Sequence, residues 1–223
     1  FAYIDLNNKH LRKEIKKFNP ISKIINVQMN NLKNIKKFIK NPYFTNVNNL
    51  NNLSFIMSFS KIFKLDNKKI LNTVNNFKGL NFRQQIILNN DDVIIINDSK
   101  STNFSSSINL LKSYTNIFWL VGGIPKKGDV FDLPKKYYKN IKAYIFGNNI
   151  IFFKKLFLKK LFHQSFKNLE AAVKKICFDI NKENDRKICI LFSPAAASFD
   201  QFKNFEDRGK YFNKLIKKIK LKI

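Results

Sequence analysis

The segment NDSKSTN at 97–103 places a carboxylate, an ammonium group and several hydroxyls and amides in seven consecutive positions. It directly follows an apolar run and precedes a predicted helix, so Asp98 or Thr102 could serve as the helix N-cap. That interpretation leaves Lys100 unexplained, because a cation near a helix N-terminus opposes the helix dipole. A lysine there is tolerated when an anion also binds, and we therefore favour an anion-binding site.

A second segment, GGIPKKGD at 122–129, follows another apolar run. Paired glycines permit close backbone approach, and Lys126 or Lys127 could hold a carboxylate or a phosphate. A plain tight turn explains the segment equally well. No Walker A motif, G-x-x-x-x-G-K-[ST], occurs in the chain.

A third segment, SPAAASFDQFKNFEDRG at 193–209, also begins where an apolar run ends. Small residues keep it tight, and the Ser198 hydroxyl could meet a ligand; alternatively, Ser198 or Asp200 is a helix cap. We disfavour a catalytic serine, because no G-x-S-x-G elbow surrounds it and both histidines, His10 and His163, lie in segments that we expect to be helical.

After residue 80 we expect alternating strands and helices, and these elements would position the three segments. The apolar pattern predicts a hairpin from 84–88 and 93–97, and strands at 117–121, 142–146 and 187–192. It predicts helices at 104–113, 149–160, 168–180 and 205–220. Continuous apolar strands indicate an α/β fold with a mainly parallel sheet that is covered on both faces. In such sheets ligands bind at the carboxyl ends of the strands, where the three segments fall.

The first 80 residues have a different pattern, and we place a domain boundary near residue 80. We expect helices at 9–18, 49–63 and 66–77, the second of them buried and the third capped by Asp66, and a short strand at 23–29. The chain begins at Phe1, and its first residues, FAYIDL, are typical of the middle of a domain. We therefore expect a fragment of a longer protein.

The net charge of +27 would ordinarily suggest a nucleic-acid partner. Only four of the basic residues are arginine, however, and Lys, Asn, Ile and Phe are the residues that AT-rich codons specify. Lysines are also spread through every predicted helix rather than gathered on one face. We expect no specific nucleic-acid partner. Two cysteines, no metal-ligand spacing and no membrane-length apolar run favour a cytoplasmic protein without a membrane partner.

Five sequence stretches together resemble the Mur ligase family, and within it the members that add D-glutamate. They are NNLNN at 48–52, FKGLNFR at 77–83, INDSKSTN at 96–103, GGIPK at 122–126 and LFSPAAASFDQFKNFEDRG at 191–209. The resemblance covers residues 45 to 215 well and residues 1–44 poorly.

The resemblance implies a domain organisation. Residues 1–80 would be the closing part of the family's central α/β ATP-binding domain, and residues 81–223 its Rossmann-like C-terminal domain, which binds the amino acid. The family's P-loop and Mg²⁺ ligands would lie upstream.

The resemblance also implies residue roles. Asn49 and Asn52 would approach the adenine, and Asp98 would accept hydrogen bonds from the ribose. Arg83 and Lys100 would act on the phosphates as ATP-binding and catalytic residues. The D-glutamate ligands would be Thr102, Lys126, Ser198 and the backbone of Phe205. The sequence departs from the family pattern at Asn48 and Phe82, each of which replaces a histidine.

The implied activity is that of an ATP-dependent carbon–nitrogen ligase in peptidoglycan synthesis. It would join D-glutamate to UDP-N-acetylmuramoyl-L-alanine through an acyl phosphate, with ATP and Mg²⁺ as cofactors and a monomer as the working form. The fragment alone would be inactive. Two alternatives stay open: another Mur-type or folylpolyglutamate-type ligase, and a basic nucleic-acid-binding module.

Overall fold

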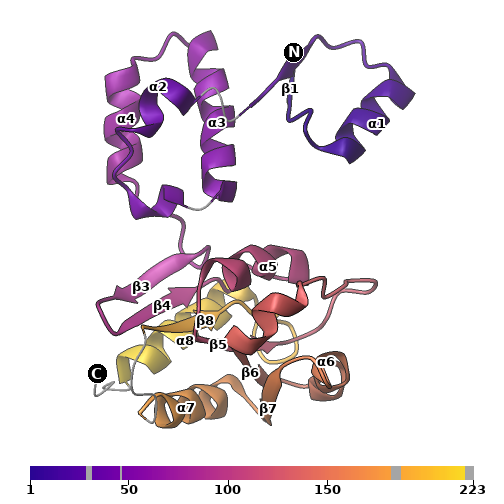
Figure 1. The fold of residues 1–223 in the computed structure, drawn as a ribbon, viewed down its shortest axis with the longest axis vertical. Coiled ribbons are helices and arrows are strands. Elements are labelled where there is room, and N and C mark those ends of the chain that lie inside the picture. Colours follow the sequence, from indigo (N-terminus) through magenta and orange to yellow (C-terminus); the bar gives the residue numbers. More distant parts are fainter. Residues whose placement is uncertain (29–31, 46, 182–186, 219–223) are drawn as a thin grey trace. The chain divides into compact units, whose positions relative to one another are not determined.

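A computed structural model describes residues 1–28, 32–45, 47–181 and 187–218 (Figure 1). The chain divides into two compact units, Phe1–Gly79 and Leu80–Ile223. Each unit has its own buried apolar residues: one cluster in the first unit and two in the second.

The first unit begins with a parallel pair of short strands, β1 (Ala2–Ile4) and β2 (Ile24–Asn26), joined through α1 (Lys9–Phe18). The Asn8 side chain caps α1 by accepting from the N–H groups of His10 and Leu11. The predicted strand at 23–29 is therefore shorter than expected, and its residue 29 lies outside the described residues.

The remaining elements of this unit are helical: α2 (Lys33–Lys36), η2 (Pro42–Thr45), α3 (Val47–Ile62) and α4 (Asn67–Asn76). Asp66 caps α4 as predicted, accepting from Lys69 N at 2.9 Å. The prediction that 49–63 is a buried helix is wrong for one face. Leu53 and Met57 are buried, whereas Ile56, Phe59 and Ile62 are 45–53% exposed.

The second unit is a six-stranded sheet in the order β3-β4-β8-β5-β6-β7. Its strands are β3 (Gln85–Asn89), β4 (Val93–Asn97), β5 (Ile117–Gly122), β6 (Ile141–Phe146), β7 (Phe162–Phe166) and β8 (Ile188–Phe192). Only the β3–β4 pairing is antiparallel; the other four are parallel. The predicted α/β class, hairpin and mainly parallel sheet are confirmed.

Helices cover both faces of this sheet, so the central strands are apolar throughout. Side chains alternate between the faces along a strand: Ile94 and Ile96 pack with α5 (Phe104–Ser113) and α6 (Ile150–Phe157). Val93 and Ile95 pack on the other face with α7 (Leu169–Ile180) and α8 (Phe205–Lys218). A 3₁₀ helix, η3 (Lys135–Asn140), precedes β6.

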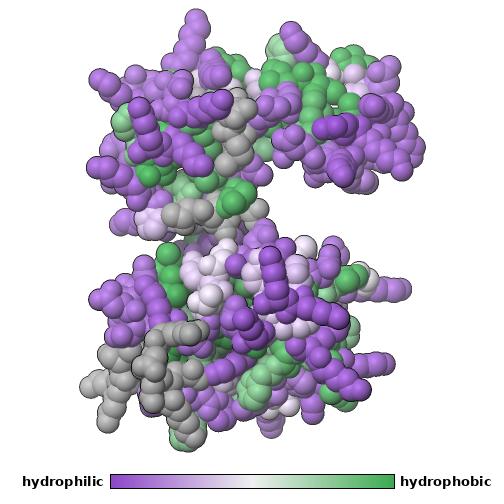
Figure 2. Space-filling model, in the orientation of Figure 1, coloured by the Kyte–Doolittle hydropathy of each residue, from purple (hydrophilic) through white to green (hydrophobic). Residues whose placement is uncertain are grey.

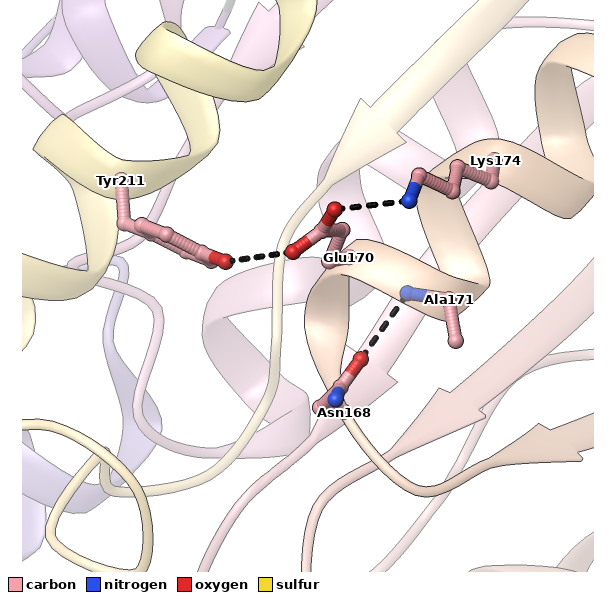
Figure 3. Close-up of polar contacts among 5 residues, drawn as sticks. All are labelled: Asn168, Glu170, Ala171, Lys174 and Tyr211. Carbon is pink, nitrogen blue, oxygen red and sulfur yellow. Dashed lines mark hydrogen bonds and ion pairs between the residues drawn. The ribbon is translucent and has the colours of Figure 1, made fainter.

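Polar contacts fix α7 and join it to α8 (Figure 3). Asn168 caps α7 by accepting from Ala171 N at 2.9 Å. Glu170 accepts from Tyr211 of α8 at 3.0 Å and pairs with Lys174 at 2.8 Å. The ion pair and hydrogen bond to Lys174, with the Tyr211 hydrogen bond, lower the pKa of Glu170.

One strand of the sheet was missed from sequence. The segment around His163 was expected to be helical but forms the edge strand β7, and His163 contacts the Leu161 carbonyl through Nδ1 at 3.1 Å. A strand that is only half covered shows no continuous apolar run, which explains the error. The helix predicted at 149–160 ends at Phe157, and that predicted at 205–220 is described to Lys218.

Hydrophilic side chains dominate the visible surface, with apolar groups in scattered patches (Figure 2). Among the described residues, no helix combines the length and apolar character needed to cross a bilayer.

Candidate active site

The three polar segments leave the carboxyl ends of adjacent strands β4, β8 and β5, and backbone bonds tie two of them together. Ile124 and Ala197 exchange N–H···O=C bonds of 2.8 and 2.9 Å. Asp129 then accepts from Phe104 N at 2.6 Å, which joins the 122–129 segment to the start of α5. The three segments singled out from the sequence therefore lie together at the carboxyl-terminal end of the sheet, which we call the sheet edge.

Two glycines allow the close approach of these segments. Gly122 and Gly123 have φ values of +152° and +123°. A Cβ at Gly122 would overlap the Phe146 carbonyl, and one at Gly123 would overlap the Ala197 carbonyl. The predicted close approach is thus to the protein's own backbone, and the segment is more than an isolated tight turn.

Asp98 occupies the end of β4 with its side chain 6% exposed. Its carboxylate accepts from Gln84 N at 3.1 Å and from Ser193 Oγ at 2.9 Å. Burial raises the pKa of Asp98 to about 7, while Ser193, the Gln84 N–H, Arg83 and Arg208 act in the opposite direction. A strongly perturbed carboxyl at a sheet edge is typical of a functional site.

The cap of α5 differs from the expectation. Asn103, rather than Asp98 or Thr102, accepts from Ser106 N at 2.9 Å. Asp98 and Thr102 are therefore not needed to terminate the helix. Thr102 is half-buried in the same segment.

Lys100 and Phe205 are in contact. The Lys100 ammonium lies 3.9 Å from the centroid of the Phe205 ring, a cation–π distance. The Phe205 carbonyl accepts from Ser99 Oγ at 2.8 Å. The structure thus brings together two residues that the resemblance assigns to different ligands.

Arg208 is a fully buried cation that sequence reasoning did not select. It donates to Ser99 Oγ at 3.1 Å, to Ser99 O at 2.7 Å and to Ala196 O at 3.0 Å. Burial lowers the pKa of Arg208 to about 10, opposed by Asp200 and Asp98, so the guanidinium is charged at neutral pH. Its rarity was the available signal, since it is one of four arginines in a lysine-rich chain.

Lys126 and Ser198 are near the paired backbone in sequence. Ser198 is 2% exposed, and its hydroxyl makes no hydrogen bond with the described part of the chain. Lys126 and Lys127 are both exposed. The structure places Lys126 two residues from the Ile124–Ala197 bridge and Ser198 next to it.

Arg83 is exposed in the connection before β3, and its charge lowers the pKa of the Asp98 carboxyl. The preceding Phe82 is buried with φ +62°, and its carbonyl accepts from Lys100 N at 3.0 Å. A Cβ at Gly209 of α8 would overlap the Phe82 ring. Phe82 therefore anchors the connection that carries Arg83.

Asn49 and Asn52 belong to α3 in the first unit. The Asn49 side chain is buried and donates to the Tyr43 carbonyl at 2.7 Å. Asn52 is exposed on the same helix.

A fourth segment, after β6, also contributes to the sheet edge and was not selected from sequence. Asp200 accepts from Asn148 N at 3.0 Å, and Gln201 donates to the Lys167 carbonyl at 2.9 Å. Gly147, at φ +96°, leaves room for the Asp200 carboxylate. These bonds join the 193–202 segment to the segments that follow β6 and β7.

The edge therefore offers cations, hydroxyls and one buried carboxyl, a set that suits a polar, anionic ligand. The described residues contain no group of three or more His, Cys, Asp or Glu placed to hold a metal ion. Burial raises the pKa of Cys177 to about 11 and that of Cys189 to about 12, so neither thiol is a ready nucleophile.

Comparison with known proteins assigns the chain to a family. A UDP-N-acetylmuramoylalanine–D-glutamate ligase from Wolbachia sp. subsp. Brugia malayi is 34% identical over 172 residues, which is 77% of this chain and 34% of that protein. Proteins of the same name from Rickettsia bellii and Rickettsia felis are 32% and 35% identical over 83% and 80% of the chain. The chain belongs to the Mur ligase family.

Solved structures of Mur ligases share the fold. The UDP-N-acetylmuramate–alanine ligase MurC of Thermotoga maritima covers 78% of the chain with a TM-score of 0.53 and 16% identity. MurF of Acinetobacter baumannii covers 77% with a TM-score of 0.52 and 13% identity. No family model matches the chain. The chain spans 34%, 41% and 40% of the length of the three ligases compared above.

Proposed function

We propose that the chain is the C-terminal part of a ligase that joins D-glutamate to UDP-N-acetylmuramoyl-L-alanine with ATP. Residues 1–80 would close the central ATP-binding domain, and residues 81–223 would form the amino-acid-binding domain. The observation that carries the proposal is the joining of the three motif-bearing segments at one sheet edge, in a chain about one-third identical to D-glutamate ligases.

In the proposed reaction ATP transfers its γ-phosphoryl group to the alanyl carboxylate and leaves as ADP. The D-glutamate amine then attacks the acyl phosphate, which forms the amide and releases inorganic phosphate and a proton. Phosphoryl transfer depends chiefly on positioning and on neutralising charge. Arg83 and Lys100 are the cations proposed for this task. Asp98 is the acceptor proposed for the ribose hydroxyls, and Asn49 and Asn52 are assigned to the adenine.

D-glutamate carries two carboxylates, which favours a pocket of cations and hydrogen-bond donors. We assign Thr102, Lys126, Ser198 and the Phe205 backbone to it. The Ser198 hydroxyl and the exposed Lys126 ammonium support this assignment, because both can donate to a carboxylate.

ATP fits the charges of this edge, but Mg²⁺ does not fit any cluster in the described parts of the chain. We therefore assign its ligands and the P-loop to residues outside these 223. We place the ligase in the cytoplasm, working as a monomer, because its proposed substrates are nucleotide-linked.

The fold alone does not choose among Mur-type ligases, since the MurC and MurF structures share it. The D-glutamate specificity rests on the sequence relatives and on the segment at 193–209. A nucleic-acid-binding module is disfavoured, because hydroxyls and a buried carboxyl at the sheet edge suit a small polar ligand better than a phosphate backbone.

The deciding experiment measures ADP release by the full-length ligase with UDP-N-acetylmuramoyl-L-alanine, ATP and one amino acid at a time. We expect release with D-glutamate and at least about 100-fold less with L-alanine, which lacks the second carboxylate. The 223-residue chain alone, without a Walker A motif, should release none. Equal rates with both amino acids would contradict the proposed specificity.

A further inference from the structure

A chain of buried hydroxyls leads to Asp98. Ser101 Oγ lies 2.7 Å from Ser107 Oγ, which lies 2.7 Å from Ser193 Oγ, and Ser193 Oγ lies 2.9 Å from Asp98 Oδ2. The three serines are at most 2% exposed. Ser101 comes from the segment after β4, Ser107 from α5 and Ser193 from the segment after β8. The row of hydroxyls therefore links all three elements to Asp98.

The geometry gives this chain a preferred direction. Each hydroxyl has one proton, so donation from Ser193 to an ionised Asp98 lets Ser107 donate to Ser193 and Ser101 donate to Ser107. All three links are then between 2.7 and 2.9 Å. In the reverse direction a protonated Asp98 donates to Ser193, and the last proton goes from Ser107 to the Ser193 carbonyl at 3.3 Å or from Ser101 to the Asn103 carbonyl at 3.5 Å. Both contacts are longer than the three links of the forward direction.

The other carboxyl oxygen is also an acceptor: Asp98 Oδ1 faces the Gln84 N–H, which can only donate. A carboxylate offers about four lone-pair positions, and these two bonds use two of them. About two acceptor positions remain, which matches a ribose with two vicinal hydroxyls.

We propose that Ser193 is a positioning residue of the nucleotide site: backed by Ser107 and Ser101, its hydroxyl keeps the Asp98 carboxylate an oriented acceptor for the ribose. The inference rests on the proposed function in taking Asp98 as the residue that meets the nucleotide. It adds a serine to which the resemblance gave no role.

The electrostatics of Asp98 make the proposal measurable. Burial is the main influence that raises its pKa, and Ser193 is the largest influence that lowers it. The charged groups that act on it are Arg83, from the connection before β3, and Arg208, from α8. Removing the Ser193 hydroxyl therefore raises the pKa further, and less of Asp98 is ionised at neutral pH.

The first test follows the Asp98 carboxyl by ¹³C NMR in the 223-residue chain, with Asp98→Asn to assign the signal. We expect a pKa of about 7 in the unaltered chain, and a rise of about one unit in Ser193→Ala. Ser193→Thr, which restores a hydroxyl, should return the value. Ser106→Ala is the matched control, because Ser106 contacts Asn103 and not the hydroxyl chain.

A second variant covers the case in which Ser193→Ala does not fold. Ser107→Ala leaves the Ser193–Asp98 bond in place but removes the donor behind it, so we expect a smaller rise. An Asp98 pKa that is unchanged in whichever of these variants folds would overturn the role of Ser193.

The second test measures KM for ATP in the full-length ligase between pH 6 and 9. Ser193→Ala should raise KM about 5- to 10-fold at pH 7, with little change in kcat, and the difference should shrink toward pH 9 as Asp98 ionises in both proteins. A raised pKa with an unchanged KM would overturn the contact of Asp98 with the nucleotide. The two tests therefore separate failure of the Ser193 inference from failure of the proposed function.

Discussion

Individual residues at the sheet edge have distinct physical states that their types alone did not reveal. Asp98 is a buried carboxyl with two donors, Arg208 a buried guanidinium with three bonds, and Lys126 an exposed ammonium. All three lie in the stretches that resemble the Mur ligases. The structure separates the residues that hold the site together from those left available to a ligand.

Lys126 and its neighbour Lys127 provide a matched pair for the D-glutamate assignment in the full-length ligase. If Lys126 pairs with a carboxylate, Lys126→Ala should raise KM for D-glutamate about 30-fold, roughly 2 kcal/mol, with KM for ATP nearly unchanged. Because Lys126 is exposed without ligand, we take the low end of the range for a broken charge pair. Lys127→Ala should have little effect. Steady-state kinetics that vary each substrate separately would decide, and small, equal effects would remove Lys126 from the site.

At the residue scale, the sequence predicted a residue's role correctly where that role depends on neighbouring residues in the chain. Asp66 was correctly predicted to cap α4, because a cap involves only neighbouring residues. The cap of α5 was predicted wrongly, since three candidates lie within six residues and only the chain path selects Asn103. Arg208 and Ser193 act through partners about a hundred positions away, which no local pattern encodes.

At the scale of elements, the central strands were predicted because burial on both faces requires continuous apolar runs. The edge strand β7 and the exposed face of α3 were mispredicted, because their burial depends on what lies beside them. The contacts between the connecting segments were likewise not predictable, because they depend on how the folded chain brings distant segments together. The Ile124–Ala197 bridge joins segments more than seventy residues apart in sequence.

Alanine substitutions at Gly123 and Gly128 test how much the Ile124–Ala197 bridge contributes to the stability of the fold. In Gly123→Ala the new Cβ meets the Ala197 carbonyl at φ +123°, so we expect a loss of about 3 kcal/mol or more in unfolding free energy. Gly128→Ala, at φ +75° with open space around it, should cost only about 1 kcal/mol of backbone strain. Urea denaturation of both variants measures the difference. Equal losses would show that backbone strain alone, rather than the bridge contact, sets the cost.

At the scale of the whole molecule, the two units differ in how fully they bury their apolar residues. In Leu80–Ile223 two clusters cover both faces of the sheet, and the central strands are completely buried. In Phe1–Gly79 the buried cluster is smaller, and Ile56, Phe59 and Ile62 are exposed on α3. Hydrophobic burial is the main favourable term in folding, so the units should differ in stability.

We therefore expect residues 80–223, produced alone, to fold into a stable domain, and residues 1–79 alone not to do so. The second unit buries a two-sided core of the size that supports independent folding, whereas the first leaves large apolar side chains in water. The measurements are cooperative urea unfolding by circular dichroism and binding of a hydrophobic dye. Residues 80–223 should show one sigmoidal transition and little dye binding, and residues 1–79 a shallow transition with strong dye binding. Cooperative unfolding of residues 1–79 without dye binding would show that its helices form a sufficient core by themselves.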